Sequence, residues 1–494
     1  MTTLTSRATA DAAGLEELEA HETFRSELAS IAPDGRRRWI YARKPSGRIY
    51  RARTIVSIVL LAFLAGAPFV HVNGLPLVML NVLERRFALF GMMFWPQDFH
   101  LVVLIALTVL VTLALSTAAV GRIWCGWLCP QTIFMEMVFR KIEFLIEGSA
   151  ERQMRRDRGP WNADKVWRKT LKHGVFFGLS FLIANILLAW VIGAEALIAI
   201  VTDPPSQHLW GLVAITIFSL VFYAVFARFR EQACVLACPY GRYMSSLIDT
   251  HTVTATYDRV RGEPRGHLSR GAQATSGASA AAGDCIDCYQ CVTVCPTGID
   301  IRNGVQLECV NCSACIDACN NVMTRVGRPT GLIRQTSHAA VHGAARGWLT
   351  PRIKAYAAVW LVLLTSVTSL VAARPDVDVL ILRQAGSLYG SELDGRIVNL
   401  YTVQVFNRAG REHQVDIRVS SPEGATLNAV GPIRDIAPFA LHEGRVLVSV
   451  PASQLSGAAT PVRFDVFVDG HVERSIESSL IGPGAAGQTG GTRP

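Results

Sequence analysis

Cysteine is missing from the chain beyond Cys319, although the sequence runs to 494 residues and contains 12 cysteines. Disulfides would be useful in an extracellular domain, but all the cysteines lie in four tight clusters, which excludes a disulfide framework. The first 53 residues lack a long apolar run and the charged, apolar and small-residue segments of a cleaved signal peptide. We therefore expect residues 1–53 to form a cytoplasmic tail with one short helix near residues 15–29.

Charged residues are also scarce, at 18% of the sequence, whereas half of the residues are hydrophobic. The formal net charge is nevertheless +9, and a nucleic-acid-binding surface is one explanation of such an excess. The basic residues, however, cluster beside long apolar runs, as Lys and Arg do on the cytoplasmic side of membrane-spanning helices. We therefore expect membrane lipid, and no nucleic acid, as a partner of this chain.

Five apolar runs are each long enough to cross a membrane, which takes about 20 mostly apolar residues in a helix. They cover residues 54–72, 101–120, 175–200, 210–227 and 355–373. A buried core helix is the alternative for any one run, but five such runs in one chain favour an α-helical membrane domain with five transmembrane helices.

The basic residues also predict the orientation of the spans. Eight Lys and Arg residues lie between positions 36 and 53, and ten lie between positions 140 and 172. The loop after the first run contains only Arg85 and Arg86, and the loop between the third and fourth runs contains neither Lys nor Arg. Because cytoplasmic loops carry the excess of Lys and Arg, we expect a bacterial inner-membrane protein with a cytoplasmic N-terminus and a periplasmic C-terminus.

Eight cysteines between residues 285 and 319 form the most specific motif. Each half has the spacing C-x2-C-x2-C-x3-C, followed by Pro296 in the first half and Asn320 in the second. This doubled spacing is typical of bacterial ferredoxins with two [4Fe–4S] clusters, in which the fourth cysteine of each motif binds the other cluster. Two structural zinc sites are the alternative, but zinc does not explain the repeated third and fourth cysteines. The expected ligands are Cys285, Cys288, Cys291 and Cys319 for one cluster, and Cys309, Cys312, Cys315 and Cys295 for the other.

Four further cysteines lie directly after the second and fourth apolar runs, in the segments GRIWCGWLCP and REQACVLACP. Both segments contain C-x3-C-P, and the offset of 234 − 125 = 109 residues indicates an internal repeat. Residues four apart share a helix face, and proline disfavours helix at the residue before it, so each pair should end a helix at the membrane surface. The candidate catalytic residues are Cys125, Cys129, Cys234 and Cys238. Their thiolates suit Cu(I), zinc or an iron–sulfur centre, and a dithiol/disulfide pair stays open. Plain apolar packing is the alternative, but two pairs in phase within a repeat argue against it.

Other candidate copper ligands lie near the opposite membrane surface. His71, Met92, Met93 and His100 could contact copper there, although the two methionines are more typical of ordinary interfacial apolar residues.

From residue 375 the apolar pattern changes to the alternation that predicts strands. Residues 377–382, 397–406, 413–420, 445–450 and 462–468 follow this pattern, separated by Gly, Pro, Asn and Asp. About seven short strands in one segment indicate an all-β immunoglobulin-like sandwich. Because no cysteine pair or catalytic group of residues occurs in it, we interpret it as a docking or shielding domain.

The expected organisation has seven parts. They are a tail at 1–53, a membrane domain with four helices and both C-x3-C-P motifs at 54–250, a flexible linker at 251–284, a ferredoxin-like domain at 285–350, a fifth transmembrane helix at 351–374, a periplasmic immunoglobulin-like domain at 375–482 and a disordered tail at 483–494.

This order of motifs resembles the cytochrome c oxidase accessory proteins called CcoG, FixG or RdxA. The segments FALFGMMFWPQDF (87–99) and GRIWCGWLCPQT are also similar to that family, and the likeness covers nearly the whole chain apart from the stretch 266–283. The resemblance implies two [4Fe–4S] clusters on the ferredoxin cysteines and a metal or redox site on the C-x3-C-P cysteines. It also implies reduction of Cu(II) to Cu(I) during assembly of a cbb-type haem–copper oxidase. The implied partners are copper, copper chaperones or oxidase assembly factors, and an electron donor.

Two other functions stay open at this point. A quinol-linked electron conduit to a periplasmic reductase shares both motif types, and a non-redox assembly scaffold could hold structural clusters. The sandwich domain and the lack of a C-x-x-C-H haem motif favour the cupric reductase.

Overall fold

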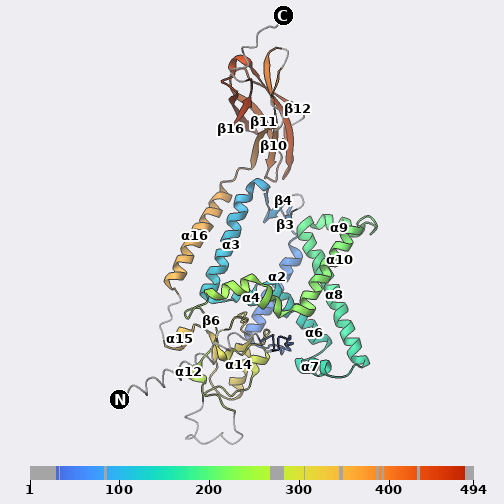
Figure 1. Ribbon diagram of the computed structural model, residues 1–494, viewed down its shortest axis with the longest axis vertical. Coiled ribbons are helices and arrows are strands. Elements are labelled where there is room, and N and C mark those ends of the chain that lie inside the picture. The colour runs from blue at the N-terminus through green and yellow to red at the C-terminus, as the bar shows by residue number, and fades with distance from the viewer. Residues whose placement is uncertain are drawn as a thin grey trace, which may run out of the picture. The chain divides into compact units, whose positions relative to one another are not determined.

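The computed structural model describes residues 29–32, 34–82, 86–267, 283–304, 306–343, 349–384, 389–391, 394–430 and 434–483. The expected helix near 15–29, most of the stretch 266–283 and nearly all of the tail after 483 lie outside these residues. The chain divides into two compact units, one formed by residues 1–68 and 100–367 and the other by residues 69–99 and 368–494 (Figure 1).

Five helices of the described chain are long and apolar enough to span a membrane, as expected. They are α2 (Arg48–Gly66), α3 (Phe99–Val120), α8 (Ala163–Ile192), α10 (Leu209–Ala224) with its continuation η3 (Val225–Phe229), and α16 (Pro351–Ala372). The first helix ends at Gly66, before the expected bound at residue 72, and His71–Val72 instead form a short strand, β1. The third ends at Gly193, whose φ of 88° breaks the helix before α9 (Ala194–Thr202). Apolar side chains such as those of Ile55, Val103 and Val362 remain exposed and would contact lipid.

Helices α8 and α10 run side by side (Figure 1), and a buried ion-pair network lies where the chain leaves α10. Glu143, on α6 (Arg140–Ile146), pairs with Arg230 and with Lys172. Glu147 pairs with Lys172 at 3.1 Å and with Lys169 at 3.0 Å. Buried charges are tolerated when they are paired, so this network ties α6 and α7 (Ala150–Arg158) to the base of the helices.

The ferredoxin segment is built on a two-stranded sheet and two helices. Strand β6 (Thr254–Tyr257) pairs antiparallel with β7 (Ile333–Thr336), and the helices are α13 (Gln290–Thr293) and α14 (Ala314–Arg325). Ala255 and Tyr257 of β6 are buried in the same core as Cys285 and Cys291. The expected boundary is therefore displaced: β6 and the short helix α12 (Arg259–Gly262), assigned above to a linker at 251–284, belong to the ferredoxin fold.

A carboxylate on α14 joins the ferredoxin segment to the first membrane helix. Asp317 accepts the backbone N–H groups of Ile49 and Tyr50 at 3.4 and 2.8 Å, and so caps the N-terminus of α2. A negative group is stabilising there because the first N–H groups of a helix have no partners within it. A Cβ at Gly47 would lie 2.1 Å from Cγ of Asp317, so only glycine leaves room for this cap.

The second unit contains the expected sandwich. Its two antiparallel sheets have the strand orders β12-β14-β10-β8 and β13-β11-β15-β16, with β9 paired to β10. Val403, Val446 and Phe464 are fully buried between them, as the alternating pattern requires. The bounds are β8 (Val377–Arg383), β9 (Gly390–Ser391), β10 (Arg396–Asn407), β11 (His413–Ser421), β12 (Thr426–Val430), β13 (Asp435–Ile436), β14 (Leu441–Pro451), β15 (Ala459–Val468) and β16 (His471–Ile481).

The loop after α2 folds onto this sandwich, within the same unit. It forms the strands β1, β2 (Leu75–Pro76), β3 (Val78–Asn81), β4 (Arg86–Leu89) and β5 (Met92–Phe94). Met93 is only 4% exposed and packs with Trp95 and Phe406, so it fills a core and does not present a free thioether. Met92 is 40% exposed.

Candidate metal centres

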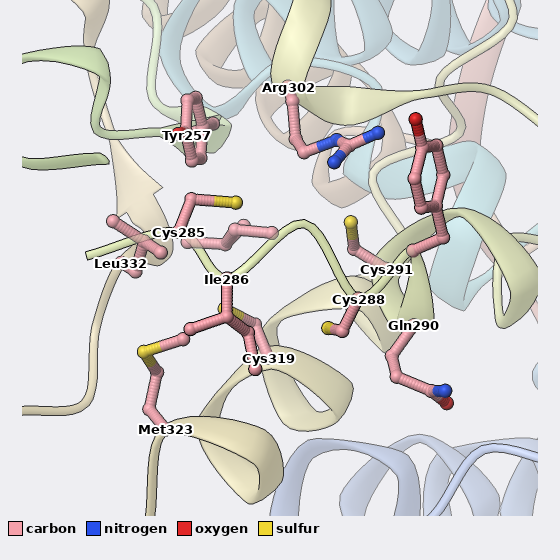
Figure 2. Close-up of a pocket in the computed structure, with 12 residues that line it drawn as sticks. Tyr257, Cys285, Ile286, Cys288, Gln290, Cys291, Arg302, Cys319, Met323 and Leu332 are labelled. Atoms are coloured by element: carbon pink, nitrogen blue, oxygen red, sulfur yellow. The ribbon is translucent and has the colours of Figure 1, made fainter. Parts of the chain in front are cut away.

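Four cysteines of the ferredoxin segment surround one cavity. Cys285, Cys288 and Cys291 of the first motif face Cys319 of the second across an empty volume of about 340 Å³ (Figure 2). Tyr257 and Arg302 border the same cavity. Cys288 is exposed, whereas the other three are buried.

The remaining four cysteines of this segment surround a second cavity of about 350 Å³. Cys309, Cys312 and Cys315 come from the second motif, and Cys295 comes from the first. The two motifs therefore exchange their last cysteines, in the arrangement that the spacing predicts for two clusters.

The backbone between the cysteines has the same unusual shape in both motifs. Asp287 and Tyr289 have φ values of 53° and 55°, and Asn311 and Ser313 have values of 52° and 61°. Each pair brackets the second cysteine of its motif. Left-handed residues of this kind occur in turns whose backbone N–H groups form anion-binding concavities at many iron–sulfur and phosphate sites. The residues present therefore fit a negatively charged cluster in each cavity.

Burial affects the chemistry of these thiols. Desolvation raises the pKa of Cys295 to about 11, that of Cys309 to about 12 and that of Cys319 to about 11. The pKa of Cys315 is raised well above its usual value for the same reason. Because thiolates are the metal ligands, binding of a metal here displaces protons that the empty site would hold.

The two C-x3-C-P motifs have matching local structures. A left-handed residue precedes each motif, Gly121 with φ of 61° and Arg230 with φ of 50°, and these two positions are 230 − 121 = 109 residues apart. The first cysteine of each motif lies in a short helical segment, α4 (Ile123–Trp127) or η4 (Ala233–Ala237). The second cysteine is extended, and the proline after it begins a new helix, α5 (Pro130–Ile133) or α11 (Pro239–Tyr243). The cysteine pairs thus lie at helix ends, as expected.

The four cysteines of these motifs come together in the structure. Cys234 interacts electrostatically with each of the other three, and Cys125 interacts with Cys129 and Cys238. Burial raises the pKa of Cys125 and Cys129, and that of Cys234 to about 12. We call this group of four thiols the four-cysteine site. Among the described residues, no three His, Cys, Asp or Glu side chains already have the geometry of a single-ion site.

The four-cysteine site lies directly against the second ferredoxin cavity. Cys125 packs in one buried cluster with Cys312, Val294 and Val310. A Cβ at Gly126 would lie 2.5 Å from the carbonyl oxygen of Val310 and 3.0 Å from the backbone nitrogen of Cys312. Backbone therefore meets backbone at this junction, with no side chain between them.

Three family models match successive parts of the chain. A model described as a 4Fe-4S binding domain matches residues 99–147, and a 4Fe-4S dicluster domain matches residues 229–338. The IG-like fold at the C-terminal of FixG matches residues 367–483.

Curated proteins match over nearly the full length. The protein RdxA of Cereibacter sphaeroides is 34% identical over 446 residues, covering 86% of this chain and 92% of RdxA. The nitrogen fixation protein FixG of Rhizobium meliloti is 29% identical, covering 92% of this chain and 94% of FixG. This chain belongs to the FixG/RdxA family. A crystal structure of a FixG-related protein from Vibrio parahaemolyticus covers 22% of the chain at 17% identity, with a TM-score of 0.18.

As a FixG/RdxA family member, the protein is a membrane iron–sulfur protein of the electron-transfer type. Its spans, ferredoxin segment and immunoglobulin-like domain agree with the expected fold class.

The structure adds residues around the four-cysteine site that the sequence did not single out. The positive charge of Arg122 acts on the thiol of Cys125, and the Arg122 guanidinium donates to the carbonyl of Leu307. Arg53 donates to the carbonyl of Gly126 at 2.6 Å. Both arginines lie among many basic residues near membrane spans, so the sequence carries no signal that separates them from lipid-facing ones.

Proposed function

We propose that this protein reduces Cu(II) to Cu(I) at the four-cysteine site, and that it acts in copper delivery during assembly of a cbb-type cytochrome c oxidase. The supporting observation is the convergence of the four C-x3-C-P thiols beside the second ferredoxin cavity. Thiolates are soft ligands that favour Cu(I), so a site of this kind stabilises the product of the reduction.

The eight ferredoxin cysteines would hold two [4Fe–4S] clusters, four on each cavity. Such clusters supply single electrons when bound, and conversion of Cu(II) to Cu(I) takes one. The ultimate electron donor and the copper-accepting chaperone are further partners in this proposal.

The protein's own residues would hold and shield the copper. Cys125 and Cys234 are buried, whereas Cys129 and Cys238 are partly exposed and so offer the way in for the metal. Burial raises the pKa of Cys129, but the backbone N–H groups of Gln131 and Thr132 at the start of α5 act in the opposite direction and favour its thiolate form. Rotation of the four side chains would complete the coordination, since no three His, Cys, Asp or Glu side chains among the described residues already have single-ion geometry.

The orientation belongs to the same proposal. The excess of basic residues before α2 and between α3 and α8 favours a cytoplasmic location for both ferredoxin cavities and the four-cysteine site. The reducing cytoplasm keeps the thiols free for metal, and the immunoglobulin-like domain would lie in the periplasm.

The test is a double substitution, Cys129→Ser with Cys238→Ser, in anaerobically purified protein reduced by dithionite. We expect the visible spectrum of the iron–sulfur clusters to be unchanged and Cu(II) reduction to fall to the rate without protein, because Ser is a poor ligand for Cu(I). Cys288→Ser should instead damage the spectrum of one cluster and slow the reduction.

Met92→Leu serves as the matched control, because Met92 is a partly exposed soft side chain outside the four-cysteine site. It should reduce copper at the wild-type rate. If the double Cys→Ser variant does so as well, copper is not reduced at the four-cysteine site and the proposal is wrong.

A further inference from the structure

Two buried arginines near the four-cysteine site have no acidic partner among the described residues. Arg53 is 2% exposed and Arg122 is 3% exposed. In both, one guanidinium nitrogen has no hydrogen-bond partner, Nη2 in Arg53 and Nε in Arg122. Leaving a buried charge uncompensated is strongly destabilising, so a negative group is required beside them.

Other buried arginines of this unit are paired. Arg230 pairs with Glu143, Arg140 pairs with Glu136, and Arg302 lies 2.6 Å from Asp300. The carbonyl oxygens that accept from Arg53 and Arg122 satisfy single N–H groups but do not neutralise a charge.

The position of the two arginines identifies the missing negative group. Arg122 lies three residues before Cys125, and its positive charge acts on the thiols of Cys125 and Cys129, while Arg53 donates to the carbonyl of Gly126, the residue after Cys125. The fold also keeps room for Arg122, because a Cβ at Gly241 would lie 2.8 Å from its Nη2.

We propose that Arg122 and Arg53 are positioning residues that compensate the negative charge of the metal–thiolate centre in the four-cysteine site. A dication bound by four thiolates has two net negative charges, which two guanidinium groups offset. Reduction by one electron adds a further negative charge, so the two arginines favour the reduced metal. The identity of that metal as copper rests on the function proposed above.

The test compares Arg122→Gln, Arg53→Gln and Arg122→Lys in the full chain with its iron–sulfur clusters in place. Cu(I) affinity is measured by competition with a chromophoric Cu(I) chelator, and the Cu(II)/Cu(I) midpoint potential by titration. Loss of a group that supports metal ligands typically lowers affinity by about 10- to 100-fold. We expect the Cu(I) affinity of both glutamine variants to fall by this factor. We also expect their midpoint potential to fall, by about 59 mV for each factor of ten by which the loss of Cu(I) affinity exceeds the loss of Cu(II) affinity. Arg122→Lys keeps the charge and should restore most of both quantities.

Arg51→Gln is the matched control, because Arg51 lies two residues from Arg53 on the same helix but is exposed. Its charge is screened by solvent, so affinity and potential should equal those of the wild type. Equal values in Arg122→Gln and the wild type would overturn the proposal. Equal losses in Arg122→Lys and Arg122→Gln would also overturn it, because the effect would then come from side-chain shape and not from charge. A loss confined to the Arg122 variants would overturn it as well, because Arg53 would then make no contribution.

A second probe separates this proposal from the proposed function. Cd²⁺ binding to the four-cysteine site is followed by its thiolate charge-transfer absorption in the same proteins. If the wild type binds Cd²⁺ there but not copper, the copper function fails, and the Cd²⁺ affinities of the arginine variants still decide the role of the two charges.

Discussion

Replacement of Gly126 by alanine tests the junction between the four-cysteine site and the second ferredoxin cavity. The added Cβ would lie 2.5 Å from the carbonyl oxygen of Val310 and 3.0 Å from both the nitrogen and the Cα of Cys312. All three are backbone atoms, so no side-chain rotation relieves the overlap. The loop that carries Cys309 and Cys312 must move away from α4.

The size of the effect follows from the energy of overpacking. Inserting one carbon into a well-packed region typically costs about 1–3 kcal/mol. If the cost falls on local opening of this loop, the open form becomes about 5- to 150-fold more populated. An iron chelator reaches the cluster only in the open form, so the rate of iron release should increase by the same factor.

The assay measures iron release to a chelator under anaerobic conditions. About half of the iron should leave the Gly126→Ala protein in a fast phase, because only one of the two cavities adjoins the junction. Gly178→Ala is the control: Gly178 lies on α8, and a Cβ there has no neighbour within 4 Å. If Gly126→Ala released its iron at the same rate as Gly178→Ala, the close backbone contact would not exist in the protein.

Two further predictions concern topology and the second unit. Reporter fusions at residues 160 and 300 should be cytoplasmic and a fusion at residue 420 periplasmic, because basic residues are concentrated before α2 and between α3 and α8; a cytoplasmic residue 420 would overturn the orientation. Asp98→Asn should destabilise the second unit by about 3–5 kcal/mol and speed its digestion by protease, because buried Asp98 binds Arg374 at 2.7 Å and Arg408 at 2.9 Å. The exposed residue Asp376 gives the control Asp376→Asn, and equal digestion rates for the two variants would contradict the role of Asp98.

Local spacing explains why the ferredoxin cavities were predictable from sequence. Three cysteines separated by two residues can surround only a nearby point, so the fourth ligand of each cluster had to come from elsewhere. The structure indeed brings Cys319 to the first motif and Cys295 to the second. The membrane helices were equally readable, since each must be apolar over about 20 residues.

Long-range contacts explain what was not predictable. Strand β6 is only four residues long, Thr254–Tyr257, and its partner β7 lies beyond both cysteine motifs. Its sequence alone therefore resembles part of a linker. Met93 was a plausible surface ligand until its packing against Trp95 and Phe406 placed it in a core. The left-handed shape of Tyr289 and Ser313 is imposed by the surrounding fold, because neither residue type favours it.

The internal repeat accounts for the charge of the four-cysteine site. At the offset of 109 residues, Arg122 corresponds to Glu231, so two motifs with matching cysteine and proline positions carry opposite charges at this position. Glu231 is neutralised by Arg37 from the N-terminal segment, whereas Arg122 meets no carboxylate among the described residues. A symmetric repeat with glutamate at both positions would place two carboxylates beside four thiols and oppose their ionisation. Under the proposed function, the exchange of this one charge would favour thiolates in the duplicated motif, on the side that adjoins the second ferredoxin cavity.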